Sequence, residues 1–183
     1  TYINKDDISA ELYLISKNGE GDINIDFKNI NQEESVGYTG SLDLKNLNLG
    51  KLAETKSLGL SSFNVNVNGK GFTAESLDTE VTGKLEFIEI NNYRYNNINV
   101  DGNLKYPIFD GKLESLDPNF LFNFEGLVDA SQEINTYKFS SEVKYADLYL
   151  LNFIEKDEIS IFKGKLDIDM KANSIDDAIG EIT

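Results

Sequence analysis

The sequence contains no cysteine, no histidine and no tryptophan among its 183 residues. Disulfide bonds, thiolate or imidazole catalysis and ordinary zinc sites all need cysteine or histidine, so the sequence excludes them. We therefore expect no enzyme activity, no metal and no cofactor. The absence of cysteine leaves the compartment open, because a cysteine-free protein suits both the cytosol and an envelope space.

Positive charge is scarce. Seventeen Lys and Arg are scattered among 32 Asp and Glu, which gives a formal net charge of −15 and a pI near 4.3. Binding of nucleic acid requires clustered cations that neutralise phosphates, and attraction to an anionic membrane surface requires the same. Both classes of partner are disfavoured.

The sequence also lacks an apolar run of about 18 residues, and its N-terminus has no basic and then apolar signal pattern. It begins at Thr1 without Met and ends at Thr183 in the middle of a pattern. We expect residues 1–183 to form one module, an internal slice of a longer repetitive protein whose targeting segment lies outside it.

Strict alternation of apolar and polar residues is present, most clearly from Tyr93 to Asp129. This period of two predicts strands with one apolar and one polar face. Tyr106-Pro107 and Asp117-Pro118-Asn119 supply the reversals between the strands. The apolar or small in-phase residues are Ile98, Val100, Gly102, Leu104 and Tyr106, then Phe109, Gly111 and Leu113, then Phe120, Phe122, Phe124, Gly126 and Val128.

The same alternation recurs along the chain and predicts roughly ten strands. Asn18-Gly19 is typical of a tight hairpin, and Asn96-Asn97 predicts a bulge because the apolar phase slips there. Short helices are predicted near Leu47–Ala53, at Thr73–Glu80 and at Asn173–Ile182. The fold class is therefore all-β: a curved, mostly antiparallel sheet, as a β-taco groove or an open sandwich, with two or three short helices. The further predicted strands cover residues 10–16, 23–27, 38–46, 62–69, 81–90, 137–144 and 160–171.

An internal repeat of 99 residues aligns Tyr38 with Tyr137, Lys45 with Lys144 and Leu52 with Leu151. It divides the chain into copies at roughly 38–136 and 137–183, the second of them truncated. Such repeats build elongated stacks in which each unit contacts its neighbours.

The segments TGSLDLKNLNLGKL, FNVNVNGKGF, SLDTEVTGKLEF, YRYNNINVDGNL, FDGKLESLDPNFLFNFEGLVD and ADLYLLN together resemble the AsmA-like superfamily and, within it, the TamB family of translocation and assembly module subunits. The resemblance covers the chain from about Tyr38 onward and includes no catalytic signature. It implies a periplasmic protein anchored in the inner membrane by a helix outside this fragment. Its apolar β-groove would serve outer-membrane biogenesis by transfer of phospholipid or another acyl-chain ligand, or by assembly of β-barrel proteins with outer-membrane partners.

The Phe-rich face has to be covered, because burying one Phe side chain is worth roughly 1.5 to 3 kcal/mol. A second sheet would cover it in a β-sandwich, whereas acyl chains would fill an open groove. The alternative function is a carbohydrate-binding or adhesive β-sandwich of the cell surface. The groove-lining, lipid-binding candidates are Phe63, Val65, Leu85, Phe87, Val100, Leu104, Phe109, Leu113, Phe120, Phe122, Phe124 and Val128.

Other possible sites are each better explained by structure. Alternating acids such as Asp167 and Asp169, joined by Asp22 or Asp26, have the oxygen ligands of a cation site but are typical of a wet strand face. A sugar platform would rest on Tyr93, Tyr95 and Tyr106, which are typical packing residues. Residues 68–71 indicate a hairpin turn rather than a phosphate loop, and residues 146–153 indicate a plug on the sheet edge rather than a membrane-surface helix.

Overall fold

The protein is described here as a computed structural model, in which residues 6–31, 36–52, 54–71, 76–154, 160–173 and 179–182 are defined. These residues form eleven strands and one four-residue helix, α1 (Leu49–Leu52). The strands are β1 (Asp7–Ser16), β2 (Gly19–Lys28), β3 (Gly37–Asn48), β4 (Leu58–Lys70), β5 (Asp78–Ile90), β6 (Tyr93–Lys105), β7 (Ile108–Asp117), β8 (Phe120–Asp129), β9 (Thr136–Asp147), β10 (Ile161–Lys171) and β11 (Ile179–Ile182).

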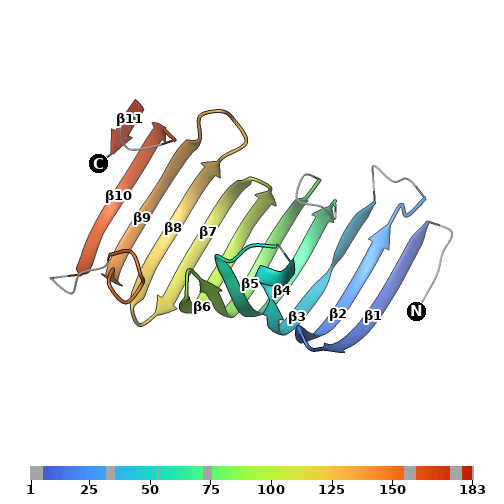
Figure 1. Cartoon of the computed structure of the whole chain (residues 1–183). Coiled ribbons are helices and arrows are strands. Elements are labelled where there is room, and N and C mark those ends of the chain that lie inside the picture. The colour runs from blue at the N-terminus through green and yellow to red at the C-terminus, as the bar shows by residue number, and fades with distance from the viewer. Residues whose placement is uncertain are drawn as a thin grey trace.

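All eleven strands belong to one open sheet in which spatial order follows chain order from β1 to β11 (Figure 1). Every neighbouring pair is antiparallel. The prediction of an all-β, mostly antiparallel sheet is confirmed. Within the described residues no second sheet lies against the first, so the sheet is a single layer with both faces open over most of its length.

Short reversals with suitable residues produce this meander. Asn18 and Gly19 stand at the turn between β1 and β2, where Gly19 has a φ of 135°. Asn91 and Asn92 join β5 to β6 with φ values of 49° and 65°. Two successive positive φ values are typical of a tight hairpin turn, and Asn tolerates them better than most residues.

The pairing register separates the residues into two faces. One row across the sheet consists of Leu12, Ile23, Leu42, Val65, Gly83, Val100, Leu113, Phe124, Ser141 and Leu166. The neighbouring row on the opposite face consists of Glu11, Asn24, Ser41, Asn66, Thr82, Asp101, Lys112, Glu125, Ser140 and Asp167. Because side chains alternate between faces along each strand, the period of two yields one apolar face and one polar face.

Register shifts interrupt several strands toward the ends that lie at the bottom of Figure 1. They occur between Leu44 and Leu47 in β3 and between Leu58 and Ser61 in β4. In β5 the shift leaves Glu86 as an extra residue, and in β6 Asn97 has a φ of 52°. The predicted slip at Asn96-Asn97 is thus confirmed. Bulges bend strands and increase their twist, so their alignment across neighbouring strands forms a crease in the sheet.

The helix predictions succeed only in part. The short helix near Leu47–Ala53 is present as α1. The other two predictions are wrong where the structure describes them: Asp78–Glu80 begin β5, and Ile179–Ile182 form β11. Residues 73–75 and 174–178 of those predicted helices lie outside the described residues. Residues 179–182 form a strand instead of a helix because the edge of β10 offers backbone donors and acceptors with which they pair.

The 99-residue repeat stays a prediction. Two of its corresponding elements are alike, since β3 and β9 each have twelve residues and start 99 positions apart. Both also bulge at corresponding places, after Leu44 in β3 and after Val143 in β9.

Candidate functional site: an uncovered apolar sheet face

Eleven of the twelve predicted groove residues share the apolar face. Phe63, Leu85 and Phe122 belong to one row, Val65, Val100, Leu113 and Phe124 to the next, and Leu104, Phe109 and Val128 to a third, with Phe120 near the crease. These side chains come from the five strands β4 to β8. The alternation in the sequence was sufficient to bring them together, because the register of a meander is fixed by its short turns.

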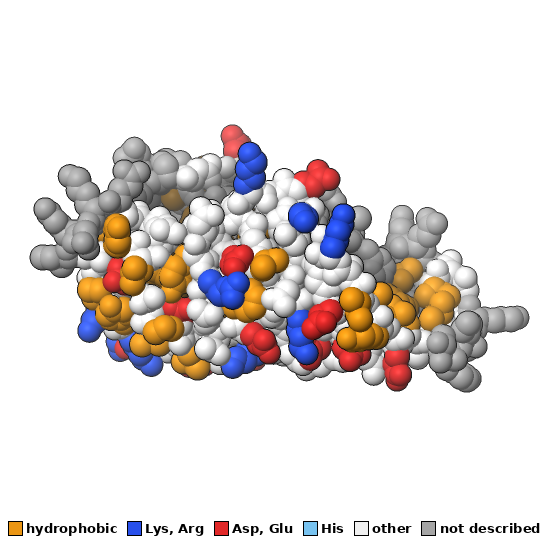
Figure 2. All heavy atoms as spheres, turned by 60° about the horizontal axis from the view of Figure 1, so that its bottom comes forward, with side chains coloured by type: hydrophobic (Ala, Val, Ile, Leu, Met, Phe, Trp, Pro, Cys, Tyr) orange, Lys and Arg blue, Asp and Glu red, His pale blue; other side chains and the backbone are white. Residues whose placement is uncertain are grey.

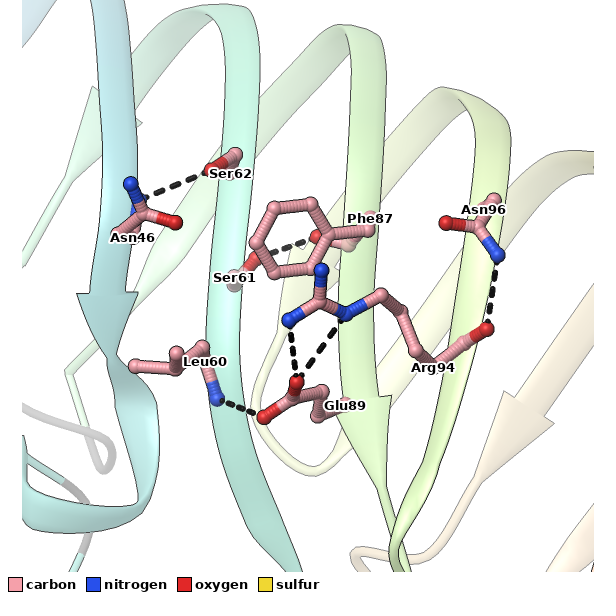
Figure 3. Close-up of polar contacts among 8 residues, drawn as sticks. All are labelled: Asn46, Leu60, Ser61, Ser62, Phe87, Glu89, Arg94 and Asn96. Carbon is pink, nitrogen blue, oxygen red and sulfur yellow. Dashed lines mark hydrogen bonds and ion pairs between the residues drawn. The ribbon is translucent and has the colours of Figure 1, made fainter.

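Phe87 is the exception, and its prediction as an inward residue is wrong. Phe63 pairs with Leu85, but Ser62 pairs with Phe87, so Glu86 is an extra residue that reverses the phase of β5. Phe87 therefore lies on the polar face, where the guanidinium of Arg94 sits 4.0 Å from its ring centre (Figure 3). The strands in Figure 3 arch over, and Phe87 and Arg94 lie on the outer side of the arch. The apolar face is the inner side.

Little within the described residues covers the apolar face. Of the eleven candidates on it, only Val65 is buried, with 5% of its surface exposed, and the others are half-buried. The chain has 12231 Å² of accessible surface. A compact monomer of this mass has roughly 8,800 Å². Figure 2 shows groups of hydrophobic side chains at the surface along the molecule, with charged side chains between them.

A row of glycines crosses the middle of this face. Gly102, Gly111 and Gly126 pair with one another on β6, β7 and β8, and the row ends at Val81 and Phe139. An aromatic ring lies against one of these glycines, and the Cβ atom of a Phe side chain lies against another. A Cβ atom at Gly102 would lie 3.2 Å from the Phe109 ring, and one at Gly126 would lie 2.8 Å from Cβ of Phe139. The rings of Phe109, Phe124 and Phe139 flank the row, with centroids 6.1 Å apart for the first two and 4.9 Å apart for the last two, so the face beside the glycines is aromatic.

One end of the face is closed by the connector between β9 and β10. Leu151, with 2% exposure, packs with Tyr95, Val143 and Ala146 at the crease, and Leu148 packs against the same cluster. The rings of Tyr95 and Phe120 meet edge to face there, with centroids 5.9 Å apart. The predicted plug is therefore present, but it covers the sheet face near the strand ends rather than the sheet edge.

A buried carboxylate lies at this closed end. Asp117 has no exposed surface. Its oxygens accept hydrogen bonds from the Tyr93 hydroxyl at 2.6 Å, from the Asn96 backbone and side-chain nitrogens at 2.9 and 2.8 Å, and from the Asn119 backbone at 2.8 Å. Because four donors surround it, the carboxylate is satisfied without a cation. Burial, with the hydrogen bond to Asp117, raises the pKa of Tyr93 to about 12, and burial also raises the pKa of Tyr95.

The turn pattern of the sequence predicts only that Asp117 lies in a turn and does not predict its burial. A usable signal was present, because Leu113, Ser115 and Asp117 are in phase and the position of Asp117 therefore belongs to the apolar face. A carboxylate at an inward position indicates a buried polar network. Tyr93 and Asn96, which donate to this carboxylate from β6, can be identified only from the tertiary structure.

On the polar face, side chains bind the backbone amides that the bulges free. Glu89 Oε2 accepts a hydrogen bond from the Leu60 amide at 2.9 Å, while Glu89 Oε1 lies 2.6 Å from Nη2 of Arg94 (Figure 3). The Leu60 amide and then Arg94 lower the pKa of Glu89. Ser62 Oγ accepts from the Asn46 amide at 2.9 Å. These contacts tie β3, β4, β5 and β6 together along the crease.

The hollows found among the described residues lie mainly on the polar face. The largest, about 550 Å³, crosses β6 to β10 between charged and amide side chains such as Lys112, Glu114 and Asn123. Val100, Leu113 and Phe124 also contribute atoms to its floor. The two lysines that line it form ion pairs, Lys112 with Glu125 at 3.0 Å and Lys165 with Glu142 at 3.4 Å. This hollow is a shallow trough between two rows of solvated side chains on the polar face. The apolar candidates form an open surface on the other face and do not line an enclosed cavity.

The other candidate sites do not assemble. Asp22 and Asp26 on β2 lie near the opposite edge of the sheet from Asp167 and Asp169 on β10. Asp169 forms an ion pair with Lys138 at 2.9 Å, and Asp167 accepts a hydrogen bond from Ser140. The described residues hold no group of three or more acidic side chains placed for a metal.

The tyrosine and glycine candidates also have structural roles. Tyr93 and Tyr95 belong to the cluster at the crease, whereas Tyr106 is 59% exposed in a turn. Asn68, Gly69 and Lys70 still belong to β4, so the reversal predicted there begins later. Neither set forms a sugar platform or a phosphate loop.

Two further observations bear on identity. No helix in the described ranges is both long and apolar enough to cross a membrane. Comparison of the chain with protein-family models, with curated proteins and with solved structures finds no match.

Proposed function

We propose that this chain is a non-enzymatic module of the cell envelope that holds the acyl chains of phospholipids, or of similar lipids, on its apolar sheet face. The observation that carries the proposal is the single-layered sheet with one continuous apolar face and one charged face. A globular protein would bury such a face within its own core. Here the described residues supply only the connector at one end.

An acyl chain suits this surface because its binding needs area and no fixed polar partners. Each buried methylene contributes about 0.8 kcal/mol, so a chain lying across several strands gains several kcal/mol. The aromatic rings beside the glycine row, those of Phe109, Phe124 and Phe139, present apolar area for it. The polar face, with the chain's net charge of −15, keeps the loaded module in water.

The resemblance to the AsmA-like superfamily and its TamB family supports the same function from the sequence side. In this proposal the full protein is periplasmic, with an inner-membrane anchor outside residues 1–183, and it passes lipid toward the outer membrane. The second candidate from the sequence, a carbohydrate-binding β-sandwich, loses support because no second sheet is present among the described residues.

The test is native mass spectrometry of the purified chain after incubation with phospholipid vesicles and gel filtration. We expect the wild-type chain to carry phospholipid and Phe124→Asp to lose it, because a carboxylate on the apolar face costs several kcal/mol to bury. Asn123→Asp is the control, since it introduces the same carboxylate one residue away on the polar face and should keep the lipid.

Circular dichroism and thermal melting establish that both variants are folded. A wild-type chain that remains free of lipid contradicts the proposal. Equal lipid content in folded Phe124→Asp contradicts it as well.

A further inference from the structure

The sequence contains two Asn-Gly dipeptides, Asn18-Gly19 and Asn68-Gly69, which the structure places in different surroundings. Asn-Gly is the dipeptide most prone to deamidation, because glycine has no side chain to hinder attack of its backbone nitrogen on the asparagine side chain. Asn18 and Gly19 stand at the turn between β1 and β2, whereas Asn68 and Gly69 lie within β4. The two dipeptides are chemically alike, so a difference in their reactivity would come from the fold.

At the β1–β2 turn a cation lies beside the half-buried side chain of Asn18. Nζ of Lys51, a residue of α1, donates to Oδ1 of Asn18 at 3.3 Å. The turn is held in place, because the Asn18 backbone oxygen accepts from the Asn48 amide at 2.9 Å and the Asn18 amide donates to Oγ of Ser16 at 3.1 Å. When a nucleophile attacks Cγ of Asn18, negative charge develops on Oδ1, and a cation at this distance stabilises it.

Within β4 the surroundings of the second dipeptide are unfavourable for the same reaction. Nδ2 of Asn68 donates to Oε2 of Glu80 at 3.2 Å, so an anion lies beside this side chain. β4 also pairs with β3 on one side and with β5 on the other, where Gly69 is opposite Tyr38 and Thr79. The sheet therefore fixes the backbone of Gly69, and a carboxylate opposes the build-up of negative charge at Asn68.

We propose that Asn18 deamidates in the folded protein, with Lys51 stabilising the tetrahedral intermediate, while Asn68 stays intact. The Gly19 backbone nitrogen loses its proton to a solvent base and forms a bond to Cγ of Asn18. The bond from Cγ to Nδ2 then breaks, and Nδ2 takes up a proton and leaves as ammonia. Water opens the resulting succinimide at either carbonyl carbon, which gives aspartate or isoaspartate at position 18.

The modification changes the turn in two ways. It adds one carboxylate, which pairs with the Lys51 ammonium where the neutral amide now accepts a hydrogen bond. In the isoaspartate form it also adds one methylene to the backbone of the short loop between Ser16 and Gly19. This inference concerns covalent modification and goes beyond the proposed lipid binding.

The test is incubation of the folded 183-residue chain in neutral buffer made with heavy-oxygen water, followed by digestion after lysine and mass spectrometry. The peptides 18–28 and 57–70 separate the two dipeptides. We expect Asn18 to convert about tenfold faster than Asn68, with incorporation of one heavy oxygen atom. In guanidinium chloride, where neither Lys51 nor Glu80 is held beside its asparagine, the two should convert at similar rates. A rate ratio that is equal in the folded and the unfolded chain overturns the proposal.

Lys51→Met removes the cation and should slow the conversion of Asn18 about fivefold, whereas Lys51→Arg keeps the charge and should retain most of the rate. Lys56→Met is the matched control, since it makes the same substitution at an exposed lysine between α1 and β4 and should leave the rate unchanged. Circular dichroism and thermal melting establish that the variants are folded. An Asn18 rate that is unchanged or faster in folded Lys51→Met overturns the proposal, as does a wild-type chain whose Asn18 stays intact.

Discussion

The hydroxyl of Tyr93 donates a 2.6 Å hydrogen bond to Oδ1 of Asp117, a carboxylate with no exposed surface that lies among the aromatic rings at the closed end of the apolar face. The bond joins the first residue of β6 to the last residue of β7. Asn119 extends the network, because its side chain donates to the Tyr93 hydroxyl at 3.2 Å. The crease is therefore held by buried polar bonds as well as by packing.

Asp117→Ala is expected to lower the free energy of unfolding by about 3 kcal/mol, because removal of the carboxylate leaves buried donors on Tyr93, Asn96 and Asn119 without an acceptor. Urea denaturation followed by circular dichroism measures the change. Asp110→Asn is the control: Asp110 is on the same strand but exposed on the polar face, and its change should stay within about 0.5 kcal/mol. Equal losses of unfolding free energy in the two variants would show that the hydrogen bonds of Asp117 do not stabilise the fold.

Stability is expected to fall steeply at alkaline pH. Burial and Asp117 raise the pKa of Tyr93 in the folded state to about 12, compared with 10.0 for a free tyrosine. The folded state thus holds the phenol proton more tightly, so this contribution is complete below pH 10 and is lost as pH rises through 12. Tyr93→Phe should be less stable at neutral pH but should decline less steeply in this window. Denaturation curves at stepped pH values measure both, and an unchanged slope contradicts the assignment.

Glu89→Gln is expected to lower stability at neutral pH by about 1 kcal/mol, because the amide oxygen still accepts from Leu60 but the ion pair with Arg94 is gone. The lowered pKa of Glu89 makes its contribution present above its usual value of 4.5 and lost as pH falls through the lower folded pKa. The variant should therefore lose less stability on acidification, as denaturation curves at stepped acidic pH values will measure. Glu86→Gln, an exposed change on the same strand, is the control and should change stability at neutral pH by no more than about 0.5 kcal/mol.

Gly126→Ala is expected to destabilise the protein by about 2 kcal/mol, because its φ of 143° is unfavourable for Ala and the new Cβ would lie 2.3 Å from the Lys138 carbonyl oxygen. Gly37→Ala is the matched control, since its Cβ would lie 3.4 Å from the nearest neighbour, the Gly69 carbonyl oxygen. Thermal melting of the two variants compares them directly. Equal melting temperatures would mean that the glycine row is not required for the close approach of β8 and β9.

Much of the fold was predictable because its information is local. Alternation at Val100, Leu113 and Phe124 reports a pleated strand with one apolar face, and turn residues such as Asn91 and Asn92 report where each strand ends. In a meander of consecutive hairpins these two features also fix the register. Eleven candidates could therefore be placed on one face before their neighbours were known.

The failures share a non-local cause. Phe87 is out of phase with Leu85 because Glu86 bulges against β4, and Ile179–Ile182 are extended because β10 offers an edge. Asp117 needs Asn96 from another strand to become a satisfied buried carboxylate. Each depends on a partner strand that the local sequence does not specify.

The sequence by itself determined the two-faced strands, the absence of thiol and imidazole chemistry and the acidic surface, because alternation and composition act residue by residue. Only the tertiary structure decided that the strands form one layer in chain order, that bulges crease it and that the described residues leave most of its apolar face open. Those properties depend on which backbone edges pair and on what, if anything, packs against the finished sheet.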